Sequence, residues 1–283
     1  MSDNYKGLDF HQTFKPERSC LSSLMMNLPE CSGKNVQEIS KLTGIPTGSS
    51  SGKVAPTISY LEFGGLIKEK LVNRKYELTL TKLGETVLSE DPGLMENLTL
   101  LLFHCMLTRR NNGADLWSFI ICDVLGRYHG KITKANLSKE LELHFGKTLN
   151  MAPFNGTYSG FLDQIGVLKI SENDYVLHTQ TFNSEFIYLY GLILYEYWAD
   201  WMKGFTEEEI EKLNISSSEI TAPQILETGF RYPFGWSEHE EYQVLEALHD
   251  RGIVSLNRQM TPFAVRKLYT KEQLIDMLYS ELC

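Results

Sequence analysis

The sequence contains few cysteines, and their spacing suits neither a disulfide framework nor a zinc site. Only five cysteines occur in 283 residues, and no two of them form a CxxC pair: Cys20, Cys31, Cys105, Cys122 and Cys283. An odd number of widely spaced cysteines excludes the disulfide framework of small secreted domains. The absence of CxxC pairs excludes the usual cysteine-based zinc sites. Such cysteine usage is typical of a protein of the reducing cytoplasm.

The sequence also lacks a long apolar segment. Its two longest uncharged apolar runs are LTLLLFHCML, residues 98–107, and FIYLYGLILY, residues 186–195. Each is about half the length that a membrane-spanning helix needs. The N-terminal residues MSDNYKGLDF carry no basic segment followed by an apolar one, which a secretory signal requires. We therefore expect no membrane partner and a cytoplasmic location.

Signatures of catalysis are missing as well. GSSSGKV, residues 48–54, resembles a phosphate-binding loop, but Gly48 lies one position too close to Gly52, and Val54 replaces the magnesium-binding hydroxyl. SEHEEY, residues 237–242, lacks the second histidine of a zinc protease, because Gln243 stands four residues after His239. We expect no catalytic residue, no metal and no cofactor, and hence a non-enzymatic protein. The sequence leaves open a nuclease site whose carboxylates come together only in the folded protein.

Charge is distributed unevenly along the chain. The net charge is -9. Residues 1–110 contain 13 Lys and Arg against 12 Asp and Glu, residues 111–180 contain 6 against 7, and residues 181–283 contain 8 against 17. Because salt screens charges over about 10 Å, the acidity of the last third says little about the first. The acidic last third predicts contact with a protein partner or a second copy of the chain.

The first third carries the order of elements found in a winged helix-turn-helix domain. NVQEISKLTG, residues 35–44, predicts a short helix that ends at Gly44. In VAPTISYLEF, residues 54–63, the apolar Val54, Ile58 and Leu61 recur at i, i+4 and i+7, which predicts a second helix. Residues 66–72 and 76–80 then predict a hairpin around residues 73–75.

The same order of elements recurs later in the chain. YLEFGGLIK, residues 60–68, aligns without a gap with FLDQIGVLK, residues 161–169, and ALHDRGIVS, residues 247–255, is a weaker third copy. Any glycine-capped helix that precedes a strand would give a similar alignment. We expect a mainly α fold with small β-hairpins, built from tandem winged helix-turn-helix modules joined by apolar helices.

Three segments follow from these patterns. Residues 1–110 are expected to form an N-terminal winged-helix module with flanking helices. Residues 111–180 are expected to form a second winged-helix-like module. Residues 181–283 are expected to form an acidic, aromatic-rich helical module with a possible third winged-helix-like unit.

Several short motifs resemble those of a prokaryotic domain family of unknown function. They are His11, Thr13 and Phe14 of an HxTF motif, the Ser51–Lys53 stretch that opens a helix, and Leu83-Gly84 followed by DPGL at residues 91–94. The resemblance covers most of the first 125 residues. Members of the family recur in anti-phage defence loci, near DNA-phosphorothioation genes and genes resembling phosphoadenosine-phosphosulfate reductases. The resemblance therefore implies a defence setting and a DNA-related task.

The charge of the first module fits contact with duplex DNA. Residues 34–86 contain 8 Lys and Arg against 5 Asp and Glu. Basic or hydroxyl residues stand at the start of the second helix and at the wing tip, where winged helices touch phosphates and groove edges. The predicted DNA-binding residues are Ser49, Ser50, Ser51, Lys53, Thr57, Arg74 and Lys75. The corresponding wing tip of the second module instead carries Glu172 and Asp174, which would repel phosphates.

Two hypotheses follow for function. In the first, the protein binds DNA through its N-terminal module in prokaryotic anti-phage defence, as a regulator or as the DNA-engaging subunit of a complex. In the second, it is a structural adaptor subunit that uses winged-helix folds only for protein–protein contacts. Basic wing tips are also common as solvated turns, so both hypotheses stay open at the level of sequence.

Overall fold

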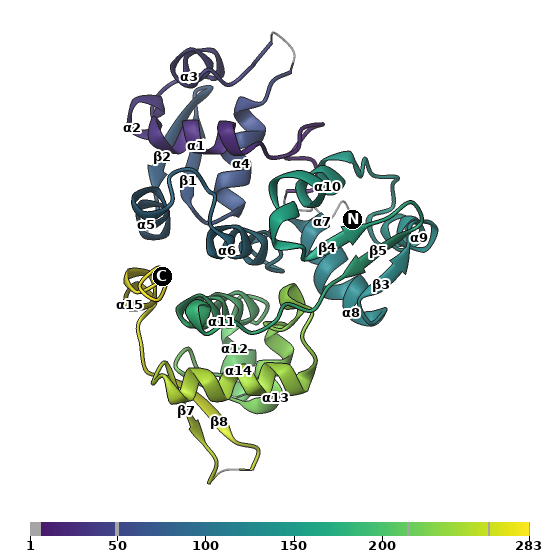
Figure 1. The fold of residues 1–283 in the computed structure, drawn as a ribbon, viewed down its shortest axis with the longest axis vertical. Coiled ribbons are helices and arrows are strands. Elements are labelled where there is room, and N and C mark those ends of the chain that lie inside the picture. Colours follow the sequence, from purple (N-terminus) through teal and green to yellow (C-terminus); the bar gives the residue numbers. More distant parts are fainter. Residues whose placement is uncertain (1–6, 49–50, 214, 260, 283) are drawn as a thin grey trace.

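Small antiparallel sheets lie among many helices in this protein (Figure 1), as a computed structural model of residues 7–48, 51–213, 215–259 and 261–282 shows. About 53% of the residues are helical. The expectation of a mainly α fold with small β-hairpins is therefore confirmed. The strands fall into three separate sheets, one in each third of the chain.

The first unit comprises five helices and a hairpin. Its elements are α1 (Arg18–Met26), α2 (Leu28–Cys31), α3 (Val36–Thr43), α4 (Val54–Phe63), β1 (Ile67–Val72), β2 (Lys75–Leu80) and α5 (Lys82–Glu90). A capping box between Asn35 and Glu38 starts α3, and Gly44, with φ of 72°, ends it. An isolated antiparallel β-bridge joins Lys34 to Tyr76, so an extended residue ahead of α3 pairs with β2.

The second unit begins with an apolar helix. Its elements are α6 (Asn97–Leu107), α7 (Asp115–Ser118), the π-helical η1 (Phe119–Val124), α8 (Leu125–Arg127), β3 (Lys131–Thr133), α9 (Lys134–Phe145), α10 (Ala152–Gly156), the π-helical η2 (Thr157–Phe161), the 3-10 turn η3 (Asp163–Ile165), β4 (Leu168–Ile170) and β5 (Asp174–Leu177). The three strands are antiparallel in the order β3-β5-β4.

The third unit has the same strand order. Its elements are η4 (Ser184–Phe186), α11 (Ile187–Met202), α12 (Glu207–Lys212), β6 (Glu219–Thr221), α13 (Ala222–Thr228), η5 (Tyr232–Phe234), α14 (Glu238–Asp250), β7 (Val254–Asn257), β8 (Ala264–Lys267) and α15 (Lys271–Asp276). Its antiparallel sheet runs β6-β8-β7.

The three units therefore repeat one topology. In each, a short extended segment precedes two helices and a hairpin, and it pairs with the second strand of that hairpin. The sequence patterns predicted α3, α4 and the hairpin of the first unit. They did not predict the leading strands, because one bridge residue or three strand residues are too few to show alternation.

A continuous core joins the units. Every residue of α6 from Leu98 to Leu107 is buried, and α11 is almost entirely buried. Among the described residues, no helix is long and apolar enough to cross a bilayer. These two helices instead pack against each other inside the protein. Both sequences are apolar all round, and a helix with such a sequence is covered by protein on every side.

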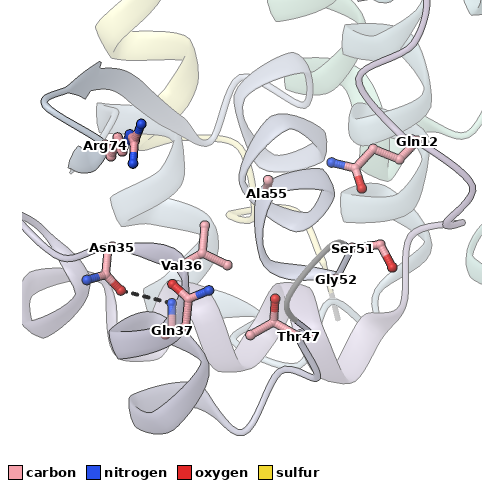
Figure 2. Close-up of a pocket in the computed structure, with 10 residues that line it drawn as sticks. Gln12, Asn35, Val36, Gln37, Thr47, Ser51, Gly52, Ala55 and Arg74 are labelled. Carbon is pink, nitrogen blue, oxygen red and sulfur yellow. Dashed lines mark hydrogen bonds between the residues drawn. The ribbon is translucent and has the colours of Figure 1, made fainter.

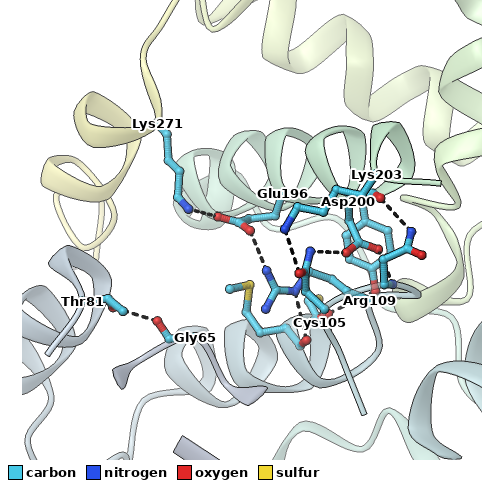
Figure 3. Close-up of polar contacts among 12 residues, drawn as sticks. Gly65, Thr81, Cys105, Arg109, Glu196, Asp200, Lys203 and Lys271 are labelled. Atoms are coloured by element: carbon cyan, nitrogen blue, oxygen red, sulfur yellow. Dashed lines mark hydrogen bonds and ion pairs between the residues drawn. The ribbon is translucent and has the colours of Figure 1, made fainter. Parts of the chain in front are cut away.

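Polar contacts hold the third unit to the other two, and the pair between Arg109 and Glu196 among them is buried (Figure 3). Arg109, at the end of α6, donates to the Glu196 carboxylate of α11 over 2.7 Å, and Lys271 pairs with the same carboxylate. Helix α15 then packs against α5, where Lys82 lies 2.9 Å from Asp276. The C-terminal helix thus returns to the first unit, although its sequence lies in the predicted third segment.

Candidate nucleic-acid interface

The tip of the first hairpin presents two exposed cations. Asn73 and Arg74 form its two-residue turn, with φ of 50° and 63°, and β1 and β2 pair from Val72 and Lys75 outward. Positive φ at both positions matches the twist of a tight hairpin. Arg74 and Lys75 are exposed, and neither forms an ion pair within the described part of the chain. Within these residues Arg74 and Lys75 are thus outside any ion pair, although the pKa of the partly exposed Glu38 is lowered first by a backbone hydrogen bond and then by nearby cations, of which Lys75 is one.

A short loop before α4 stands close to this tip. Thr47 and Gly52 form an isolated antiparallel bridge, and the Lys53 amide donates to the Pro46 carbonyl over 2.9 Å. A Cβ atom at position 52 would overlap Thr47, so the turn requires glycine there. Ser51 is exposed. The predicted Ser49 and Ser50 lie outside the described residues.

The loop and the hairpin tip border one cavity of about 440 Å³ (Figure 2). Arg74 and Gln12 line it from opposite sides, and Ser51 lies at the loop. The start of α3 closes it, where the Asn35 side chain accepts from the Gln37 amide over 3.0 Å. The structure thus brings together Ser51 and Arg74, which are 23 positions apart in the sequence.

Lys53 is not free in this arrangement. Its ammonium lies 2.7 Å from the Glu17 carboxylate, and the two side chains are 28% and 34% exposed. The partner comes from the residue that precedes α1, 36 positions earlier, which no local pattern signals. Lys53 therefore keeps only part of the attraction for phosphate that was predicted for it.

The structure contradicts the prediction that Thr57 lies at a DNA groove. Thr57 is 5% exposed, and its hydroxyl donates to the Lys53 carbonyl over 2.7 Å. No residue of α4 is fully exposed. One covering contact comes from Phe10, whose ring packs on Tyr60 and Phe63. Thr57 therefore lies on the covered side of the helix, and only Ala55, Ser59 and Glu62 of α4 are partly exposed.

Several of the corresponding charges in the other two units are paired. In the second unit Asp174 lies 3.3 Å from Lys131. In the third unit Arg266 lies 2.6 Å from Glu219, and Arg258 pairs with Glu246. Burial lowers the pKa of Lys267 to about 8, with the Trp198 ring 4.1 Å from its nitrogen. The free basic tip is thus a feature of the first unit among these three.

Two buried titratable groups lie away from this surface. Burial lowers the pKa of His104 to about 4, and its two ring nitrogens contact Tyr158 and the Pro233 carbonyl. Burial raises the pKa of Glu241 to about 7, although Arg231 lies 3.3 Å away. The sequence did not indicate either shift. Among the described residues, no three His, Cys, Asp or Glu side chains gather as metal ligands.

Comparison with solved structures shows the fold. Two crystal structures of SspB, one of them bound to a magnesium ion, superpose with TM-scores of 0.66 and 0.63. Each alignment covers 98% of this chain and 87% of the SspB chain, at 13% sequence identity. No family model matches the chain, and no curated protein matches it significantly. The chain shares a fold with SspB over nearly its whole length.

Proposed function

We propose that the three units are winged-helix modules and that the first contacts duplex DNA with its wing tip and the loop before α4. Arg74 and Lys75 bind backbone phosphates, and Ser51 with the neighbouring loop approaches the same strand. The observation that carries this proposal is the pair of exposed cations at the tip, which have no ion-pair partner in the described residues. Phosphate contacts supply most of the affinity of non-specific DNA binding.

The proposed setting is prokaryotic anti-phage defence, in which the protein is non-enzymatic and acts as a regulator or as a subunit of a DNA-engaging complex. The sequence resemblance in residues 11–94 supports this setting. The fold likeness to SspB, at 13% sequence identity, also supports it. Because helix α4 is covered, the proposed contact is with the DNA backbone, and base reading through α4 is not part of it.

Binding of a fluorescent duplex, followed by anisotropy at low salt, tests the proposal. We expect the wild-type protein to bind and Arg74→Ala/Lys75→Ala to bind at least tenfold more weakly. Lys139→Ala is the matched control, because Lys139 is an exposed lysine on α9. No binding by the wild type at low salt would refute the proposal.

The adaptor role is the second candidate, and the paired charges of the second and third units favour it there. The second unit carries the exposed Glu172 at its hairpin, and the third carries three glutamates in the first turn of α12. In this role those two units contact a partner protein or a second copy. Analytical ultracentrifugation tests self-association: a monomer at all concentrations would leave a partner protein as the occupant.

A further inference from the structure

A second cavity lies where the first unit meets the second. It has a volume of about 680 Å³ and opens between the start of α1 and the π-helical η2. Its lining includes Lys15, Glu17, Arg18, Ser19, Gly93 and Gly160. None of these residues lines the first cavity or lies at the tip of the first hairpin.

The cavity carries excess positive charge. The aliphatic chain of Lys15 packs along α10. Its ammonium lies near Gly160, 3.5 Å from the place that a Cβ atom of that residue would occupy. Lys15 has no ion pair within the described residues, and the charge of Glu17 is balanced by Lys53. Arg18 adds a further cation. Two uncompensated cations therefore face one opening.

Arg18 also has an unused hydrogen-bond donor. Its Nε atom is buried and has no partner among the described residues, and its guanidinium lies 5.9 Å from the centre of the Phe161 ring. A buried donor without an acceptor is rare in folded proteins and often marks the place of a water or an ion. Arg18 lines the cavity, so its other guanidinium N–H groups can donate to an anion there.

The surrounding backbone suits an anion as well. Helix α1 starts at Arg18, and the side chain of the preceding Glu17 does not cap it. The first N–H groups of the helix therefore do not donate to that side chain. Gly93 and Gly160 line the cavity without side chains, which lets a ligand approach the main chain. Arginine and lysine together are typical of phosphate recognition.

Three motifs from distant parts of the sequence converge at this cavity. The HxTF motif ends at Phe14, directly before Lys15. Lys53, of the stretch that opens α4, pairs with the lining residue Glu17. In the DPGL motif Gly93 lines the cavity, and the Pro92 carbonyl accepts from Ser22 over 2.5 Å. The proposed DNA contact uses Ser51 of the second motif but leaves the HxTF and DPGL motifs without a role.

We propose that this cavity binds a phosphate group, through Lys15, Arg18 and the first amides of α1. The phosphate comes either from the DNA backbone or from a free nucleotide. In the first case the site extends the proposed DNA contact from the wing tip to the junction of two units, and so rests on the proposed function. In the second case it is independent of DNA binding.

Isothermal titration calorimetry with sodium phosphate, with AMP and with a short duplex tests the proposal. Ionic strength is held constant with NaCl, and the variants are Lys15→Ala, Arg18→Gln and the control Lys139→Ala. We expect saturable phosphate and AMP binding that weakens at least tenfold in Lys15→Ala and Arg18→Gln and is unchanged in the control. Lys15 is exposed, so Lys15→Ala keeps the test valid if Arg18→Gln does not fold.

The outcomes separate the two sources and the two proposals. Weaker duplex binding by Lys15→Ala, alongside weaker phosphate binding, supports the DNA backbone as the source. Unchanged duplex binding with weaker AMP binding supports a free nucleotide. Phosphate binding by a wild type that binds no duplex supports the cavity while refuting the wing-tip function. Absence of saturable phosphate and AMP binding, or equal affinity in all variants, overturns the inference.

Discussion

Single residues decide how the charge of this protein is used. Arg74 and Lys53 are both cations of the first unit, yet only Lys53 has a carboxylate within reach, at 2.7 Å. The position of Glu17 could not be read from the sequence, because it precedes a different helix. Composition therefore located the basic region, but it could not show which of its cations are paired with a carboxylate.

His104 predicts a pH dependence of stability. Its pKa is about 4 in the folded state, below its ordinary value of 6.5, so only the unfolded state binds the proton between these values. Stability therefore falls as the pH falls through this window, by about 1.4 kcal/mol per unit. Between pH 6.5 and pH 5, urea unfolding is expected to lose about 2 kcal/mol more in the wild type than in His104→Gln. Equal losses would contradict this.

Glu241 predicts the opposite sign. Its pKa of about 7 lies above that of an ordinary glutamate, so its contribution to stability is present at low pH and is lost as the pH rises through 7. The neutral Glu241→Gln is therefore expected to gain stability relative to the wild type between pH 5 and pH 8. Thermal unfolding at both pH values measures this, and a difference that does not change with pH would refute it.

At the scale of elements, the hairpin and helices could be predicted, but the covering of α4 could not. The predicted strands 66–72 and 76–80 differ from β1 and β2 by one residue each. Val54, Ile58 and Leu61 correctly marked the buried face of α4. Thr57 was expected at a DNA groove but is buried, and Phe10, which lies more than 40 residues earlier, packs on Tyr60 and Phe63 of the same helix. Periodicity reports one buried face and cannot report a second, distant partner.

Thr57→Val tests the correction to α4. The valine keeps the volume of threonine and removes a hydroxyl that contacts only the helix backbone. Duplex affinity is expected to stay within twofold of the wild type, and stability to change by about 1 kcal/mol or less. Anisotropy and urea unfolding measure the two quantities. A tenfold loss of duplex affinity in a folded variant would show that Thr57 takes part in DNA binding and would contradict the correction.

At the scale of the whole molecule, contacts between distant segments hold the three units together. The α6–α11 contact joins the third unit to the second, and the return of α15 to α5 joins it to the first. Neither is visible in local patterns, since the residues involved lie about 90 and 190 positions apart. The repeated topology was partly visible, because glycine-capped helices before hairpins recur at similar positions.

The buried ion pair between Arg109 and Glu196 predicts a large difference between two alanine variants. Glu196→Ala leaves Arg109, only 7% exposed, without its carboxylate, which is expected to cost about 3–5 kcal/mol. Lys271→Ala removes a cation that is 50% exposed, with an expected cost of about 1 kcal/mol or less. Urea unfolding measures both, and equal costs would contradict the assignment of Arg109 as the buried partner.

The central claim is that the free cations at the first wing tip bind DNA phosphates, and the salt dependence of duplex affinity tests it most directly. Each phosphate contact contributes about 0.9 to the slope of log K against log salt concentration. The slope is expected to flatten by about 2 in Arg74→Ala/Lys75→Ala and to stay unchanged in Lys139→Ala. An identical slope in the wild type and the double variant would contradict the claim.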